Sequence, residues 1–413
     1  MLGEERDVVP VGGAEEEELV DLFAKCAKLT KPKEAKAAGF YPYFIPLQSE
    51  AGPEVIIDGR RMLMLGSNNY LGLTQHPKVK EAAIRAVEKY GVGCTGSRLM
   101  NGTLDLHLEL EHRLARFMQK DDAIVFTTGY QTNLGTISAL VGRHDTVVID
   151  RSDHASIIDG CRLSHGNVMR YRHNDMADLE RALAGIDQRQ GILIAVDGVF
   201  SMEGDLAPMP EIVRLKKKYN ARLLVDDAHS VGVFGPGGRG VAEHFGLQDE
   251  ADLVLATFSK SFASIGGFVA GSEDAIYYIR HSARSFLFSA AIPPASAAAA
   301  LAALDVIEGE PELRDQLWAN TRFMKKALDE LGFNTGMSES PIIPLIVGDD
   351  FRVGAFWKAL FDAGVFTNAA VSPAVEPDRG LIRTSYMATH KTEHLERALE
   401  ILEKVGRACE LIP

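Results

Sequence analysis

The feature of this sequence that most constrains its fold is an alternation of short apolar runs with helical patterns over residues 61–305. Strand-like runs lie at residues 123–127, 146–150, 192–197, 222–226, 253–257 and 267–270. Helical patterns separate most of them, as at residues 131–141 and 211–219. Two more helices are predicted earlier, one beginning at Pro77 and one spanning about residues 104–117. Because strands that alternate with helices form a mainly parallel sheet covered on both faces, the sequence predicts an α/β fold.

The sequence pattern divides the chain into three parts. Residues 1–60 are acidic and weakly patterned, and this pattern predicts an N-terminal arm or a helix that lies across the rest of the protein. Residues 61–305 are the predicted large domain. The pattern then changes, and residues 306–413 predict a smaller α+β C-terminal domain. Its expected elements are a long helix, two strands and a closing helix, at residues 311–331, 342–347, 381–386 and from about 392.

Charge and cysteine content exclude several classes of function. The 413 residues include 44 Lys and Arg against 57 Asp and Glu, which gives a net charge of −13. Binding to nucleic acid needs clustered positive charge, so we expect no nucleic-acid partner. The four cysteines lie far apart without a CxxC pair. This spacing predicts neither a metal site nor disulfides, and it favours a reducing compartment.

The sequence has no pattern of a secretory signal or a membrane-spanning segment. The first residues are acidic, whereas a signal peptide begins with basic residues. The most apolar stretch, residues 289–307, is rich in alanine and is interrupted by Pro293 and Pro294. It therefore predicts a packed helix, and we expect a cytoplasmic protein.

Two glycine motifs and a histidine pair are poor candidates for a functional site. Residues 91–96 and 235–240 both match GxGxxG, but neither lies directly between a strand and a helix, as dinucleotide binding requires. His107 and His112 have acidic residues between them. We expect both to be surface residues of an exposed helix.

Polar residues end several predicted strands, where open α/β sheets bind their ligands. These residues are Thr127, Thr128, Asp150, Asp197, Asp226 and Thr257. Any one of them could simply cap the next helix. However, His229 follows Asp226 closely, and Lys260 lies between Ser259 and Ser261 just after a strand. That is an unusual place for a solvated lysine, so the group as a whole predicts a site.

The same group matches what pyridoxal phosphate requires from a protein. A lysine supplies the Schiff base, and a carboxylate keeps the pyridine nitrogen protonated. Hydroxyl groups and backbone N–H groups at a helix N-terminus bind the phosphate. Thr128, Gly129 and Tyr130 begin a predicted helix, and the glycine lets the backbone approach a phosphate closely. Pyridoxal phosphate is therefore the predicted cofactor.

Seven segments of the sequence resemble the α-oxoamine synthases, which are pyridoxal phosphate enzymes of fold type I. The segments are GSNNYLGL (66–73), YGVGCTGSRLMNGT (90–103), DHASIIDG (153–160), DGVFSMEGD (197–205), VDDAHSVGVFG (225–235), TFSKSFASIGGF (257–268) and LIRTSYMATH (381–390). The resemblance covers about residues 35–410, and the segments occur in the family's order. It implies a large cofactor-binding domain with a smaller C-terminal domain.

The resemblance implies a role for each matching residue near the cofactor. Lys260 would form the Schiff base and later act as the base on the substrate Cα–H. Asp226 would pair with the pyridine nitrogen, and His229 would hydrogen-bond the phenolic oxygen. His154 would stack on the ring, and Ser201 would lie near the cofactor oxygens. The phosphate would be held by Gly129, Tyr130, Thr257 and Ser259.

The resemblance also implies substrate contacts and a shared active site. Arg383 would bind the amino-acid carboxylate, since its planar fork can make two parallel hydrogen bonds. Asn68 and Asn69 are both candidates for contacting the substrate. Ser289 would be donated to the cofactor phosphate of the other subunit, which implies a homodimer. Some relatives carry an arginine just before the proline-rich loop where this chain has Val371, so carboxylate recognition would rest on Arg383 alone.

The setting of Lys260 between two serines most resembles the branch of the family that joins L-serine to a long-chain acyl-CoA. The implied reaction is a decarboxylating condensation that releases CoA and CO₂. A glycine- or alanine-using synthase stays open as an alternative. A non-catalytic partner subunit is a second alternative, against which the presence of Lys260, Asp226, His154 and His229 argues. Because the product would be an amphiphile, a peripheral encounter with a membrane also stays open.

Overall fold

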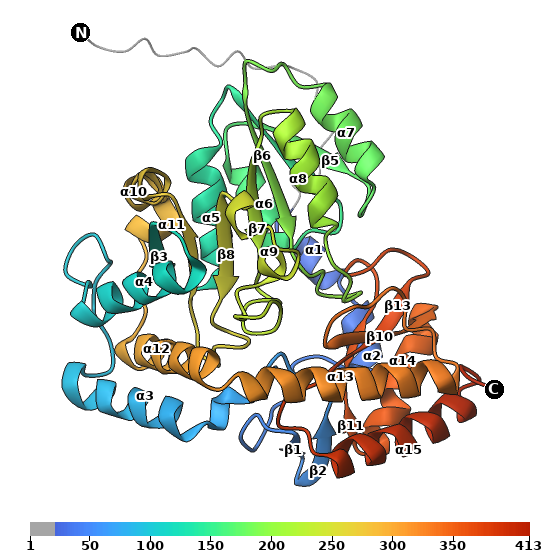
Figure 1. Cartoon of the computed structure of the whole chain (residues 1–413). Coiled ribbons are helices and arrows are strands. Elements are labelled where there is room, and N and C mark those ends of the chain that lie inside the picture. Colours follow the sequence, from blue (N-terminus) through green and yellow to red (C-terminus); the bar gives the residue numbers. More distant parts are fainter. Residues whose placement is uncertain (1–20) are drawn as a thin grey trace.

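The structure, a computed structural model, describes residues 21–413 (Figure 1). The beginning of the predicted arm, residues 1–20, lies outside the described residues. The next part contains two short helices, α1 (Ala24–Ala27) and α2 (Lys31–Ala37). Strands β1 (Glu54–Ile57) and β2 (Arg60–Met64) then pair in antiparallel fashion, and β2 pairs in parallel with β11 (Val365–Phe366). Residues 54–64 therefore share a sheet with the C-terminal part of the chain.

The centre of the molecule is a seven-stranded sheet with the order β3-β9-β8-β7-β6-β4-β5. Its strands are β3 (Asp122–Phe126), β4 (Asp145–Asp150), β5 (Asn167–Tyr171), β6 (Gly191–Asp197), β7 (Arg222–Asp226), β8 (Leu253–Thr257) and β9 (Gly267–Gly271). Strand β9 is antiparallel to both neighbours, and the other pairs are parallel. The predicted α/β class with a mainly parallel sheet is confirmed. The sequence did not predict edge strand β5, because only its last residue is buried and the segment lacks an apolar run.

Helices cover both faces of this sheet, because alternate strand residues point to opposite sides. In β3, Val125 packs into one apolar core and Ile124 into another. The first core also receives α3 (Pro77–Tyr90), α4 (Asp105–Met118), α7 (Met176–Ala184), α8 (Met209–Lys218) and α12 (Pro294–Gly309). The second receives α5 (Gly129–Leu140), α6 (Ala155–Leu163), α10 (Glu273–Ser282) and α11 (Arg284–Leu287). Short elements in the connections are η1 (Leu73–Gln75), α9 (Val241–His244) and η2 (Gln248–Glu250).

The C-terminal elements, orange to red in Figure 1, gather on one side of the molecule. They pack around a separate apolar core. The long helix α13 (Pro311–Leu331) leads into it, and an antiparallel sheet has the order β10-β13-β12. The remaining elements are β10 (Ile342–Gly348), α14 (Asp350–Asp362), β12 (Asn368–Ala370), β13 (Gly380–Ser385) and α15 (Thr392–Ala408). The smaller C-terminal α+β region is as predicted, whereas the domain boundaries at residues 60 and 305 stay predictions.

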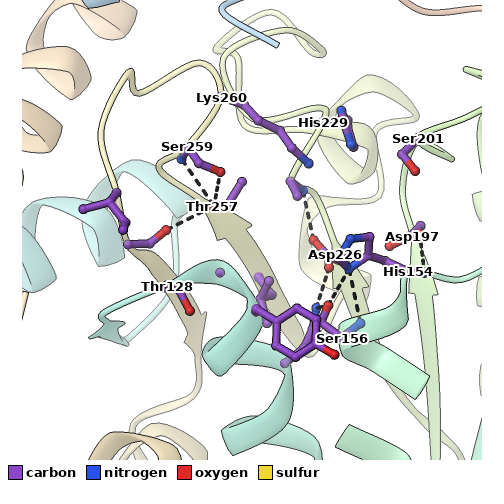
Figure 2. A pocket seen from close by; sticks show the side chains of 17 residues that line it. Thr128, His154, Ser156, Asp197, Ser201, Asp226, His229, Thr257, Ser259 and Lys260 are labelled. Atoms are coloured by element: carbon purple, nitrogen blue, oxygen red, sulfur yellow. Dashed lines mark hydrogen bonds between the residues drawn. The ribbon is translucent and has the colours of Figure 1, made fainter. Parts of the chain in front are cut away.

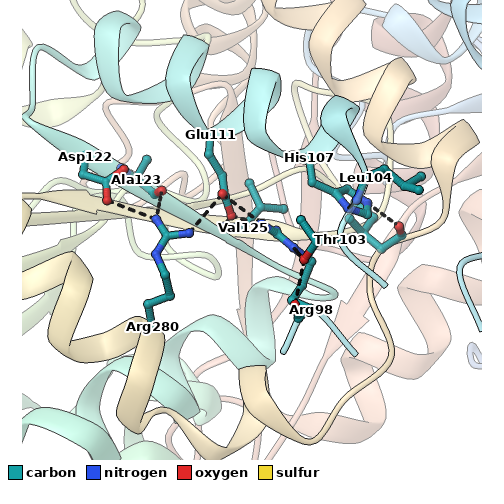
Figure 3. Close-up of polar contacts among 10 residues, drawn as sticks. Arg98, Thr103, Leu104, His107, Glu111, Asp122, Ala123, Val125 and Arg280 are labelled. Atoms are coloured by element: carbon teal, nitrogen blue, oxygen red, sulfur yellow. Dashed lines mark hydrogen bonds and ion pairs between the residues drawn. The ribbon is translucent and has the colours of Figure 1, made fainter. Parts of the chain in front are cut away.

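The prediction that His107 is a surface residue is wrong. Its side chain is fully buried in α4, where Nδ1 accepts a hydrogen bond from the N–H of Leu104 and Nε2 donates to the carbonyl of Ile292 at 2.9 Å (Figure 3). His107 shares its helix face with the buried Leu110 and Leu114. The acidic neighbour Glu111 is buried too, because Arg98 and Arg280 pair with it. The prediction for His112 is confirmed, since it is exposed.

The alanine-rich stretch forms a packed helix, as predicted. Helix α12 begins at Pro294 and buries most of its alanines, with α3 and α4 as neighbours. None of the helices within residues 21–413 is long and apolar enough to cross a membrane. The four cysteines of the chain, Cys26, Cys94, Cys161 and Cys409, are all unpaired.

Candidate active site

A cavity of about 340 Å³ opens at the carboxyl ends of the central strands (Figure 2). Strands β6, β7 and β8 run in parallel, so their last residues and the following loops meet at one edge of the sheet. The sequence-predicted residues that line the cavity are Gly129, Tyr130, His154, Ser201, Asp226, His229, Thr257, Ser259 and Lys260. Residues that are far apart in the sequence are thus brought together at one place.

Lys260 extends into this cavity from the loop after β8 (Figure 2). Burial lowers the pKa of its amine to about 8, although the carboxylates of Asp226 and Asp197 oppose that change. A lysine is a nucleophile and a base only when it is neutral. The cavity therefore holds an amine that is partly neutral near physiological pH.

Asp226 is held at the end of β7 by two hydrogen bonds. Its Oδ2 accepts from the Nδ2 of Asn133 at 2.6 Å, and its Oδ1 accepts from the N–H of Ala228 at 3.0 Å. Asn133, on α5, uses its second amide hydrogen to donate to Ser156 Oγ at 2.9 Å. Because both amide hydrogens are used, the orientation of Asp226 is tied to that of Ser156.

Ser156 in turn orients the ring of His154. Its Oγ lies 2.7 Å from Nδ1 of His154, and its backbone N–H donates to the same nitrogen. Nδ1 is therefore the acceptor of a neutral ring whose hydrogen is on Nε2. Burial lowers the pKa of His154, and Lys260 lowers it further while Asp226 opposes both. The carboxylate of Asp197 fixes the backbone by accepting from the N–H of His154 at 2.9 Å.

His229 also lines the cavity (Figure 2), and its hydrogen-bond partner is Tyr70. The hydroxyl of the fully buried Tyr70 is 2.7 Å from Nδ1 of His229. Burial holds the pKa of His229 well below its usual value, and the positive charges of Lys260 and Arg383 add to this effect. His229 is therefore a neutral ring with a defined orientation.

The N-terminus of α5 and the end of β8 form a cradle of small groups. Thr128 caps the helix by accepting from the N–H of Gln131, and the first-turn N–H groups at Gly129 and Tyr130 have no partner within the helix. A Cβ at Gly129 would lie 2.7 Å from the side chain of Thr257, so only glycine fits here. The Thr257 hydroxyl is 2.9 Å from that of Ser259. These donors suit a phosphate.

Arg383, on β13, lies beside the cavity but not in its lining. Its Nε donates to the carbonyl of Ser201 at 2.6 Å, and its Nη2 donates to Asn68 Oδ1 at 2.9 Å. Asn69 is engaged elsewhere, because its amide donates to the carbonyl of Ala51 and to Thr74 Oγ1. Of the two candidate asparagines, the geometry favours Asn68.

Ser289 is also absent from the cavity lining, and its hydroxyl accepts a hydrogen bond from Gln131 Nε2 of the same chain at 3.2 Å. Its predicted donation to another subunit stays a prediction. Val371 lies just beyond β12 and packs against the core of the C-terminal part.

Known proteins match this chain over most of its length. Residues 60–402 match Aminotransferase class I and II. The chain belongs to this family. Within it, the serine palmitoyltransferase of Sphingobacterium spiritivorum is 51% identical over 92% of this chain and 95% of that protein. The 8-amino-7-oxononanoate synthase of Thermoanaerobacter pseudethanolicus is 44% identical over 92% of this chain and 97% of that protein.

The fold has an equally clear match among solved structures. A structure of SPT with PLP internal aldimine has a TM-score of 0.93 and 37% identity, and the match covers 95% of this chain and 100% of that chain. These likenesses confirm the predicted membership in the α-oxoamine synthases of fold type I and the predicted cofactor, pyridoxal phosphate. The cavity fits that cofactor, since it contains an amine, a carboxylate and a phosphate cradle.

Sequence reasoning missed three residues that help to form the site: Tyr70, Asn133 and Ser156. Asp197 belongs to the group of polar strand ends that predicts the site, but the sequence assigns it no role of its own. Asn133 and Ser156 lie on helices, and their hydrogen bonds orient Asp226 and His154. No local pattern reveals such contacts, because they depend on how α5 and α6 pack.

Proposed function

We propose that this protein catalyses the condensation of L-serine with palmitoyl-CoA or a similar long-chain acyl-CoA, which is serine palmitoyltransferase activity. The products are 3-oxosphinganine, CoA and CO₂, as in the first step of sphingolipid biosynthesis. The observation that carries the proposal is the 51% identity to a serine palmitoyltransferase over 92% of this chain. The geometry adds support, because Arg383 lies next to Ser201 at the edge of the cavity that contains Lys260.

Pyridoxal phosphate, when bound, supplies the electron sink that stabilises negative charge at the amino-acid Cα. Lys260 would hold the cofactor through its Nζ, and the neutral amine of Lys260 would take the proton from Cα of the amino acid. The neutral amine needed for this step is favoured by the lowered pKa of Lys260. Asp226 would hold the pyridine nitrogen protonated, which Asn133 assists by fixing the carboxylate.

The neutral rings of His154 and His229 would complete the cofactor contacts. His154 would stack on the pyridine ring, and Ser156 keeps its orientation. His229 would donate from Nε2 to the phenolic oxygen, since Tyr70 occupies the Nδ1 side. Ser201 would lie near the cofactor oxygens. The phosphate would accept hydrogen bonds from Gly129, Tyr130, Thr257 and Ser259.

Arg383 would bind the serine carboxylate, with Asn68 holding the guanidinium. Nη1 of Arg383 makes no hydrogen bond with residues 21–413, so it is free to donate. The carboxylate would be held until it leaves as CO₂, after Cα has formed its bond to the acyl carbon and CoA has departed as the thiol.

We also propose a homodimer in the cytoplasm, in which Ser289 reaches the phosphate of the other subunit. Exposed apolar side chains support the proposal, and they flank the bridge between Ser97 and Ala290 that lies beside that serine. They are Val92, Leu99, Met100 and Phe288. Association of two copies would remove this apolar surface from water, which favours the dimer. The four unpaired cysteines agree with a reducing compartment.

CoA release from palmitoyl-CoA, measured with the holoenzyme and one amino acid at a time, tests the proposal. Release with serine alone supports it, and release with glycine or alanine instead would contradict the choice of substrate. The alanine arm matters because an 8-amino-7-oxononanoate synthase is 44% identical to this chain. A protein without release and without bound cofactor absorbance would instead support the non-catalytic partner subunit.

A further inference from the structure

A histidine outside the cavity lies between two carboxylates. His173 follows β5, and its Nδ1 is 3.1 Å from Asp150 Oδ1 while its Nε2 is 2.9 Å from Asp205 Oδ2. An ionised carboxylate can only accept a hydrogen bond. Both ring nitrogens must therefore carry hydrogen, because a neutral ring would point a lone pair at one of the two carboxylates. The geometry makes His173 an imidazolium cation.

The surroundings keep this charge in place. The Asp150 side chain is fully buried, and Asp205 is largely buried. Burial alone would lower the pKa of His173, but the hydrogen bonds to the two carboxylates outweigh it and raise that pKa to about 10. Glu203 also interacts with this charge: burial raises the pKa of Glu203, and the positive His173 opposes that rise. His173 is thus charged throughout the physiological range.

His173 and its neighbour Asn174 hold a short hairpin, residues 199–206. Asp205 Oδ2 accepts from Nδ2 of Asn174 at 2.9 Å as well as from His173. Within the hairpin, the N–H of Phe200 donates to the carbonyl of Asp205, and Val199 bridges to Leu206. The imidazole also packs edge-on against Phe200, with 4.4 Å between ring centroids. The hairpin is thus attached to the end of the sheet through the charged ring of His173 and the side-chain amide of Asn174.

The hairpin connects this ring to the substrate arginine. Ser201, at its tip, lines the cavity, and its carbonyl accepts from Nε of Arg383 at 2.6 Å. We propose that His173, as an imidazolium, is a positioning residue that holds the 199–206 hairpin and thereby the guanidinium of Arg383 in the place where it meets a substrate carboxylate. The part about the carboxylate rests on the proposed function, whereas the clamp on the hairpin does not.

The test compares His173→Gln with His165→Gln, which changes an exposed histidine. A glutamine can donate to only one carboxylate and turns its oxygen toward the other. In the holoenzyme we expect amide hydrogen exchange in residues 200–205 to become roughly tenfold faster in His173→Gln only. The dissociation constant for serine, from an absorbance titration of bound cofactor, should rise by about fivefold or more, with a smaller change in kcat. Unchanged exchange in the hairpin would overturn the proposal.

Two further variants keep the test decisive. If His173→Gln does not fold, Asp205→Asn weakens the same pair while retaining the shape of the side chain, and it must also accelerate exchange in the hairpin. In the double variant H173Q/D205N, the glutamine oxygen can accept from the new amide, so exchange should return toward the wild-type rate. No rescue, together with unchanged exchange in Asp205→Asn, would contradict the clamp. If exchange in the hairpin is faster in His173→Gln but the wild type binds no serine, the result supports the clamp. It then counts only against the proposed function.

Discussion

The Nε of Arg383 donates a 2.6 Å hydrogen bond to the carbonyl oxygen of Ser201, which lies 182 positions earlier in the chain. Arg383 comes from β13 in the C-terminal part, and Ser201 comes from the hairpin that follows β6 of the central sheet. The contact therefore joins the two parts at the cavity. Because Nη2 also donates to Asn68, the guanidinium is fixed before any substrate arrives.

We expect Arg383→Lys to weaken serine binding without loss of the cofactor. An ammonium cannot replace the planar fork, and a hydrogen bond to a charged group contributes about 1.5–3 kcal/mol. The dissociation constant for serine should rise by roughly 10-fold to 100-fold, measured by absorbance titration. Arg322→Lys, at an exposed position of α13, serves as the control. A change of less than twofold in Arg383→Lys would contradict the carboxylate role.

Lys260→Ala should abolish both CoA release and the visible absorbance of covalently bound cofactor. The cavity offers no second lysine among its lining residues, so no other amine can take over. The measurement is an absorbance spectrum after reconstitution with pyridoxal phosphate, with Lys78→Ala as the control because Lys78 is exposed. A wild-type spectrum for Lys260→Ala would mean that another group binds the cofactor.

Reconstitution of the apoprotein should become faster as the pH rises through about 8. The pKa of Lys260 is lowered to about 8, and the neutral amine, which predominates above that pH, is the nucleophile. The rate of absorbance change after mixing with pyridoxal phosphate, followed from about pH 6 to 10, checks this. A midpoint close to the ordinary lysine pKa of about 10.4 would show that the cavity does not desolvate the amine.

We expect Asn133→Ala to loosen the cofactor and Asn133→Asp to loosen it more. The alanine variant removes the 2.6 Å hydrogen bond to Asp226, and the aspartate variant places a second negative charge there. Loss of one hydrogen bond to a charged group predicts a rise in the dissociation constant for pyridoxal phosphate of roughly tenfold or more. Equilibrium dialysis measures it. Equal affinity in all three proteins would show that Asn133 does not support Asp226.

The fold should lose stability in acid through His390. Its Nδ1 accepts from the N–H of Met387 and its Nε2 donates to the carbonyl of Met64, so only the neutral ring fits. Burial lowers its pKa to about 4. A histidine with a lowered folded-state pKa stabilises the fold fully above its unfolded pKa of about 6.5, and this contribution, at most about 3 kcal/mol, is lost as the pH falls from there toward 4.

Denaturant unfolding of wild type and His390→Gln at several pH values tests this expectation. The wild type should be more stable at pH 7 than the variant, and the difference should shrink as the pH falls toward about 5. His112→Gln, at an exposed site, should follow the wild type at every pH. A difference that does not depend on pH would assign the effect of His390 to packing alone.

The class of fold and the chemistry of the site were accessible from local sequence patterns. The run that ends in Asp226 is a strand because it is continuously apolar, and Lys260 is conspicuous because it follows such a run between two serines. Strand β5 is not predicted because it lacks a continuous apolar run, since it lies at the sheet edge and is mostly exposed. His107 was misjudged because an acidic neighbour suggested solvent, whereas Arg98 and Arg280 neutralise that neighbour inside the protein.

The sequence by itself determined the α/β class through the alternation of strand and helix patterns, and it indicated the cofactor through the residue types at strand ends. The family follows from the resemblance of seven segments to the α-oxoamine synthases. Only the tertiary structure decided which of Asn68 and Asn69 contacts Arg383. It alone revealed that Asn133 supports Asp226 and that His173 lies between two carboxylates. Such contacts join residues from separate elements, and the geometry of a hydrogen bond is fixed by how those elements pack rather than by any pattern within one of them.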